Sequence, residues 1–129
     1  MTGDLRQSIV ERVERYLDSW RTGDIEARRR LFSPRGLLED PVGSTPVEGG
    51  PALAAHWTHI AKEGASYETQ LKRVIVAGHE ALALALVKTV PAHGPANVTE
   101  VYALFDFDRA LEVRRLRIFH DDSCTHLAS

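Results

Sequence analysis

The sequence predicts an α+β fold in which three helices are followed by a curved, mostly antiparallel sheet. Apolar residues recur at helical spacing in the first half of the chain and alternate with polar residues in the second half. Turns rich in glycine and proline separate the segments. The 129 residues, 43% hydrophobic and 26% charged, fit one domain spanning residues 1–129.

The three predicted helices begin and end at recognisable signals. The first carries a broad apolar stripe and ends at Gly23, and the second runs from Ile25 to about Phe32 with Asp24 as its cap. The third opens at Gly50 and Pro51 and closes at Gly64. The stripe of the first helix consists of Leu5, Ile9, Val10, Val13, Tyr16, Leu17 and Trp20.

The predicted strands follow the helices, apart from one short early strand. Residues 33–36 read as a turn, 37–40 as a short extended piece and 42–49 as a loop. The polar tail from His120 to His126 reads as a frayed terminus. The four long strands are predicted over Ser66–Ala77, Ala81–Thr89, Asn97–Phe107 and Val113–His120.

Too few strands are present to close a barrel, so we expect the sheet to curve over the helices and leave a cone-shaped cavity. Strand alternation places Leu116, Ile118 and His120 on the inner face of the last strand. In the short early strand, Asp40 shares a face with Leu38. A carboxylate and an imidazole therefore point inward, which is costly unless they are partnered or used.

Composition excludes several classes of protein. The net charge of -2 and the dispersed Lys and Arg residues give no basis for binding nucleic acid or an anionic membrane. Cys124 is the only cysteine, so no intrachain disulfide forms. Without an apolar leader or a bilayer-length apolar run, we expect a cytoplasmic protein.

The stretch from Tyr16 to Trp57 resembles the ketosteroid isomerase (steroid Δ-isomerase) family. The resemblance is carried by Tyr16-Leu-Asp-Ser-Trp, by Gly23-Asp24 and above all by Glu39-Asp40-Pro-Val-Gly-Ser44. It implies the cone-shaped fold shared by nuclear transport factor 2 and the SnoaL-like polyketide cyclases. It further implies a homodimer built on the outer sheet face and a reaction that needs no metal or organic cofactor.

The resemblance also implies roles for individual residues. Asp40 corresponds to the general base, and Tyr16 corresponds to the donor that hydrogen-bonds the substrate oxygen. Ala103 stands where the family has a second, acidic donor, and loss of one such donor typically costs ~10²–10³ in rate. Phe32 and Trp57 stand where tyrosines often support the donor tyrosine.

His120 stands where the family has a large aromatic side chain. A neutral imidazole can donate one hydrogen bond, so His120 is a candidate to replace the missing acid in part or to act as a second acid or base. It fits equally well as a hydrogen-bonded structural histidine near a strand end. The sequence leaves both roles open.

The predicted pocket is walled mostly by apolar side chains. Small residues there would widen it and favour a bulky apolar substrate, provided that Leu82, Leu84 and Leu86 face outward. The predicted pocket residues are Phe32, Trp57, Ala83, Ala85, Val101, Ala103, Phe105, Leu116 and Ile118.

No metal site is predicted. His56 and His59 lie one helical turn apart without a third ligand, which is typical of an exposed helix face, and the polar tail matches no metal-ligand spacing.

Three functions fit these residues. The first is a double-bond isomerase that uses Asp40 and Tyr16, and the second is a polyketide or polyether cyclase, dehydratase or epoxide hydrolase that uses Asp40 and His120. The third is a non-catalytic module for hydrophobic-ligand binding or dimerisation.

Overall fold

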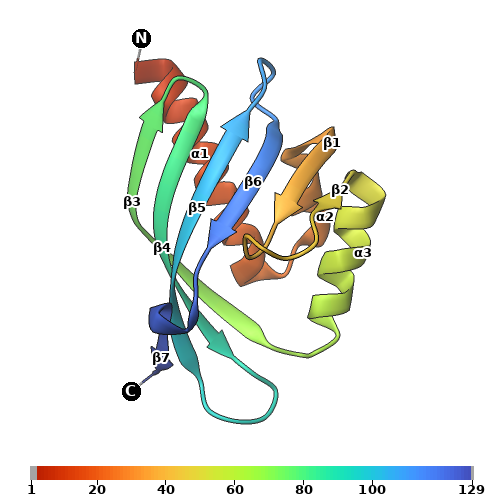
Figure 1. Cartoon of the computed structure of the whole chain (residues 1–129), viewed down its shortest axis with the longest axis vertical. Coiled ribbons are helices and arrows are strands. Elements are labelled where there is room, and N and C mark those ends of the chain that lie inside the picture. Colours follow the sequence, from red (N-terminus) through yellow and green to blue (C-terminus); the bar gives the residue numbers. More distant parts are fainter. Residues whose placement is uncertain (1–2, 129) are drawn as a thin grey trace.

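The computed structural model describes residues 3–128 and confirms the α+β prediction (Figure 1). Three helices pack on one face of a curved sheet that does not close into a barrel. In chain order the elements are α1 (Gly3–Thr22), α2 (Ile25–Arg30), β1 (Phe32–Glu39), β2 (Val47–Glu48), α3 (Gly50–Ala61), β3 (Ser66–Ala77), β4 (Glu80–Val90), β5 (Asn97–Phe107), β6 (Val113–Phe119), the 3-10 turn η1 (Asp122–Cys124) and β7 (Thr125–Leu127).

The helices follow their sequence signals closely. Helix α1 buries Ile9, Val13, Tyr16 and Ser19 on one face, as its apolar stripe predicts. The Asp24 side chain caps α2 by accepting the backbone N–H of residue 27 at 3.0 Å. Over residues 3–128, no helix combines the length and apolar character that a bilayer crossing requires.

The strand order β2-β1-β6-β5-β4-β3 explains the cone shape. Strands β3 to β6 form consecutive antiparallel pairs, while β1 lies parallel to β6 and carries the short β2 on its other edge. Helix α1 crosses behind the sheet, and α3 lies at the edge formed by β1 and β2 (Figure 1). The space between α1 and the curved strands becomes the interior of the cone.

Alternation along β4 separates small inner residues from large outer ones. Ala81, Ala83 and Ala85 are buried, whereas Leu82 is 44% exposed. The prediction that the alanine face turns inward is therefore confirmed, and the inner wall of the sheet is lined by short side chains at this strand.

Large side chains fill the other part of the interior. The rings of Phe32 and Trp57 meet with their centroids 5.5 Å apart, and those of Phe105 and Phe107 stack at 5.9 Å. Leu38, Leu53, Val113 and Leu116 complete this packed region and are at most 1% exposed.

Three local predictions are wrong, and the first is the loop predicted at 42–49, which contains the short strand β2. The predicted turn at 33–36 lies inside β1, where the pairing with β6 shifts register between Phe32 and Leu37. Gly36 allows this close pairing, because a Cβ there would lie 2.9 Å from the Val113 carbonyl oxygen. The tail predicted to fray instead forms η1 and β7, and β7 pairs with β5.

Candidate active site

The interior of the cone contains a cavity of about 310 Å³, within the size range of small-molecule sites. Six of the predicted pocket residues line it: Ala83, Ala85, Val101, Ala103, Phe105 and Ile118. Tyr16, Asp40 and His120 line the same cavity. The structure thus brings the three candidate catalytic residues together, although they come from a helix and from the ends of two strands.

Phe32, Trp57 and Leu116, also predicted as pocket residues, are not among the side chains that line this cavity. All three belong to the packed region beside it and are between 0% and 5% exposed. Alternation identifies residues that point inward, but it does not say whether an inward residue meets the cavity or the packed core.

Asp40 directly follows β1 and is held there by the backbone. The N–H of Val42 donates to the carbonyl oxygen of Ile118 at 2.7 Å, which fastens the Asp40-Pro41 segment to the end of β6. The Asp40 side chain is 24% exposed. Burial raises the pKa of its carboxyl above the ordinary value, and the nearby His120, His56 and Arg28 act in the opposite direction.

His120 follows β6 and faces Asp40 across the cavity rim. Its Nε2 lies 3.9 Å from Oδ1 of Asp40, which is within ion-pair range but too long for a hydrogen bond. The imidazole is about one-third exposed. A carboxylate and an imidazole are therefore close enough to act on one bound molecule.

Tyr16 lies on α1 with 4% exposure and is fixed by aromatic neighbours. Its ring meets the Phe105 ring edge-on at a centroid distance of 5.5 Å and the Phe32 ring at 6.4 Å. Burial first, and the negative charge of Asp40 second, raise the pKa of the Tyr16 hydroxyl. The phenol therefore keeps its proton at neutral pH and can donate a hydrogen bond into the cavity.

The chemical capacity of the cavity follows from its few polar groups. Asp40 is the only acidic side chain that lines it within residues 3–128. Ala103 lies on the wall and supplies no donor, as its alignment implied. A single carboxyl group and a protonated phenol in an apolar hollow can take a proton from carbon and stabilise the resulting negative oxygen.

Sequence reasoning missed several residues of the site. Arg28 on α2 is only 2% exposed and influences both Tyr16 and Asp40 electrostatically. His56 on α3 is half-buried near Asp40, whereas its predicted companion His59 is exposed. The apolar spacing of α2 and α3 gives no signal for either residue, since their positions depend on how these helices pack against the rest of the fold. Further unpredicted lining residues include Trp20, Ile60, Tyr67, Thr69, Thr89 and Thr99.

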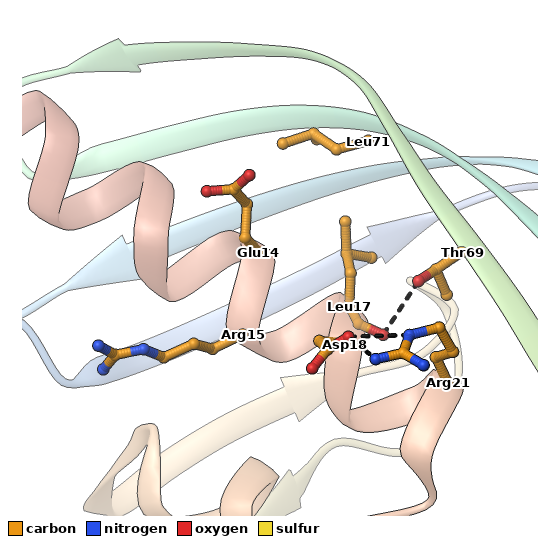
Figure 2. A pocket seen from close by; sticks show the side chains of 7 residues that line it. All are labelled: Glu14, Arg15, Leu17, Asp18, Arg21, Thr69 and Leu71. Atoms are coloured by element: carbon orange, nitrogen blue, oxygen red, sulfur yellow. Dashed lines mark hydrogen bonds and ion pairs between the residues drawn. The ribbon is translucent and has the colours of Figure 1, made fainter.

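A second depression lies outside the cone, between α1 and β3 (Figure 2). Its polar groups are mostly satisfied by each other: Arg21 binds Asp18 at 2.6 Å, and the Thr69 hydroxyl donates to the Leu17 carbonyl at 3.1 Å. Glu14 points from α1 toward β3 across this groove (Figure 2). The groove lacks the enclosed apolar lining of the inner cavity, which remains the better candidate site.

Comparison with known proteins agrees with this architecture. Residues 13–115 match the SnoaL-like domain family. The chain is 34% identical over 108 residues to the steroid Δ-isomerase of Nocardioides simplex, covering 83% of this chain and 85% of that protein.

Two solved structures share the fold at low sequence identity. The epoxide hydrolase/cyclase-like enzyme SalBIII, described in pyran ring formation in the polyether salinomycin, superimposes with a TM-score of 0.82 at 16% identity, over 95% of this chain and 98% of that chain. An LEH-like epoxide hydrolase of M. tuberculosis superimposes with a TM-score of 0.79 at 16% identity, over 92% and 86% of the two chains. Together with the matched family and the isomerase relative, the cone of helices and sheet identifies this chain as a member of the ketosteroid isomerase-like family of SnoaL-like proteins.

Proposed function

We propose that the protein is a double-bond isomerase that moves a proton within a bulky apolar ketone, such as a 3-oxo-Δ5-steroid. The observation that carries the proposal is that Asp40 and Tyr16 line one apolar cavity, where burial raises the pKa of both groups. A raised carboxyl pKa makes a stronger base, and a raised phenol pKa keeps the donor protonated. The 34% identical relative that is named as a steroid Δ-isomerase supports the same reaction class.

The proposed reaction has two proton transfers. The ionised Asp40 carboxylate removes a proton from the carbon next to the ketone, and the electron pair of the broken C–H bond forms a dienolate. The Tyr16 hydroxyl donates a hydrogen bond to the oxygen on which negative charge develops. Protonated Asp40 then returns the same proton to the carbon at the far end of the dienolate, which gives the conjugated enone and regenerates the carboxylate.

The short side chains on the inner wall leave room for a bulky substrate. Ala83, Ala85 and Ala103 leave open a region that larger side chains would fill. Because most of the lining is apolar, binding would draw on burial of the substrate's hydrocarbon surface.

The test is the ultraviolet absorbance of the conjugated enone formed from 5-androstene-3,17-dione. We expect Asp40→Asn to lower the rate by about 10²–10⁴-fold, the usual contribution of a general base. Tyr16→Phe is expected to lower kcat by about 10²–10³-fold. Asp18→Asn is a matched control, because Asp18 is 57% exposed in the outer groove. Absence of enone formation by the wild-type protein, or an unchanged rate in Asp40→Asn, would reject the proposal.

A second candidate function is acid–base chemistry by Asp40 and His120 on a polyketide, polyether or epoxide substrate. The 3.9 Å separation of their side chains favours it, since a base and an acid would then share one bound molecule. His120→Ala should abolish turnover of such a substrate and spare steroid isomerisation. Equal activity of the His120→Ala and wild-type proteins toward epoxides would reject this candidate.

We further propose that two copies of the chain associate through the outer sheet face. Leu82, Tyr102 and Phe119 are 37–44% exposed on adjacent strands β4, β5 and β6. An apolar surface of this kind is typical of a protein interface. Light scattering after size-exclusion chromatography should report a dimer for the wild-type protein and a shift toward monomer for Leu82→Glu, and a wild-type monomer at all concentrations would reject the association.

A further inference from the structure

Arg28 on α2 is buried beside the cavity, between the rings of Trp20 and Trp57. The side chain is 2% exposed, and within residues 3–128 no Asp or Glu lies at ion-pair distance from it. A buried charge without an ionic partner is costly unless hydrogen bonds and its surroundings stabilise it. Burial accordingly lowers the pKa of the Arg28 guanidinium, although arginine remains charged in proteins.

Hydrogen bonds tie Arg28 to the helical turn that carries Tyr16. Its Nε donates to the Ser19 hydroxyl at 2.9 Å, and its Nη2 donates to the Ser19 carbonyl oxygen at 3.0 Å. The Ser19 hydroxyl in turn donates to the carbonyl oxygen of Tyr16 at 2.5 Å. The guanidinium is thus held at a fixed place relative to the Tyr16 backbone.

Aromatic rings hold the other side of the guanidinium. Its central carbon lies 3.7 Å from the centroid of the Trp20 ring and 5.0 Å from that of Trp57. Trp20 also lines the cavity, so the ring that contacts Arg28 forms part of the cavity wall. Uncharged π-faces do not neutralise the positive charge, and its field therefore extends into the cavity.

We propose that Arg28 is a positioning residue of the site, whose fixed positive charge keeps Asp40 ionised in the resting protein and stabilises the negative charge that proton transfer moves from Asp40 to the substrate oxygen. This inference rests on the proposed isomerase function. The charge of Arg28 would also compensate in part for Ala103, which lines the cavity and supplies no second donor to the developing oxyanion. The charge acts through space and through Trp20 rather than by contact with the substrate.

The direction of the electrostatic effects agrees with this role. Arg28 lowers the pKa of Asp40 and of Tyr16, against the larger effect of burial on each. The other groups that act on Asp40 are His120 and His56, and both also lower its pKa when charged. An arginine side chain stays protonated in proteins, so Arg28 contributes a permanent positive charge to this set.

The experiment compares Arg28→Met with the wild-type protein and with Arg29→Met. Arg29 is the matched control, because it is the next residue of α2 but its side chain is 39% exposed and paired with Glu26. The first measurement is a pH titration of the ¹³C-labelled Asp40 carboxyl by NMR, which needs neither substrate nor turnover. We expect the Asp40 midpoint to move upward in Arg28→Met and to stay in place in Arg29→Met.

The second measurement is the rate of enone formation at a pH above both midpoints. We expect kcat to fall by about tenfold in Arg28→Met with little change in KM. An effect of this order is expected when one positive charge near a developing negative charge is removed. Methionine matches much of the volume of arginine, so the variant is expected to fold. If it does not fold, Arg28→Gln removes the same charge and keeps an amide donor for Ser19.

The outcomes separate this inference from the proposed function. An unmoved Asp40 midpoint together with an unchanged kcat in the folded variant would overturn the role of Arg28, even if the wild-type protein is an active isomerase. A moved midpoint in a wild-type protein that forms no enone would leave the charge effect standing and reject the isomerase. A purely structural role predicts loss of activity with the midpoint in place, and that result would also overturn the inference.

Discussion

The interior of the cone has a packed end and a hollow end, and the two differ in side-chain size on the same strands. At the packed end, Phe32, Trp57 and Leu116 are almost completely buried and belong to one hydrophobic cluster. At the hollow end, Ala83 and Ala85 face Tyr16 across open space. Because one end is closely packed and the other is open, substitutions at the two ends are expected to have separable effects on stability and on ligand binding.

The largest effect on stability is expected at the packed end. Leu116 and Ile118 lie two residues apart on β6, but only Ile118 lines the cavity. Leu116→Ala should cost about 4 kcal/mol of unfolding free energy, because it opens a new void in close packing. Ile118→Ala should cost about 2 kcal/mol, because some of its atoms already lack partners. Urea denaturation of both variants measures the difference, and equal losses would mean that the two ends do not differ.

The next effect is on binding at the hollow end. Ala83→Leu places a larger side chain into the cavity and should weaken binding of androst-4-ene-3,17-dione by at least about tenfold. Stability should change little, since the added atoms occupy existing space. Leu82→Met on the outer face of the same strand is the control. Binding is measured by tryptophan fluorescence, because Trp20 lines the cavity, and unchanged affinity in Ala83→Leu would place the ligand elsewhere.

A smaller effect concerns the pH dependence of stability. Because burial raises the pKa of Asp40 in the folded state, the folded protein holds this proton more tightly than the unfolded chain does. The associated stability is present below the ordinary pKa of 3.8 and is lost as pH rises through the folded-state pKa. Asp40→Asn should therefore gain stability relative to wild type between acid and neutral pH, as measured by denaturation at several pH values. A wild-type protein that gains more than the variant over this range would contradict the raised pKa.

The smallest effect on stability is expected at Trp57, whose indole N–H is an unpaired donor within the packed end. Its indole N–H is buried and has no hydrogen-bond partner within residues 3–128. Trp57→Phe removes that unpaired donor along with some packing, so the two changes partly offset each other. We expect a loss under about 1.5 kcal/mol by thermal or urea denaturation. A loss of about 3 kcal/mol or more would contradict this offset between the removed donor and the lost packing.

Much of this arrangement could be predicted from sequence because it depends on local periodicity. Alternation correctly placed Ala83, Ala85 and Ile118 on the inner face, and the boundaries of β3 and β5 were predicted to the residue. Periodicity carries no information about position along the axis of the cone, so it cannot tell that Leu116 lies in the packed region and Ile118 at the cavity.

Contacts that depend on the meeting of separate elements could not be predicted. Arg28 lies on a six-residue helix whose sequence, rich in charged residues, resembles an exposed segment. Its burial results from the crossing of α1, α2 and α3 around Trp20, which no short pattern encodes. The register shift in β1 has the same origin, because Gly36 reads as a turn residue until β6 is placed beside it.

The last strand, β7, has a practical consequence for handling the protein. It is clasped to β5 next to the cavity, where the Thr125 hydroxyl lies 2.8 Å from that of the lining residue Thr99. A purification tag or fluorescent fusion attached directly behind this strand would put load on this pairing and so disturb Thr99 in the cavity wall. Fusions are better joined in front of α1, whose first turn lies at the opposite end of the molecule (Figure 1).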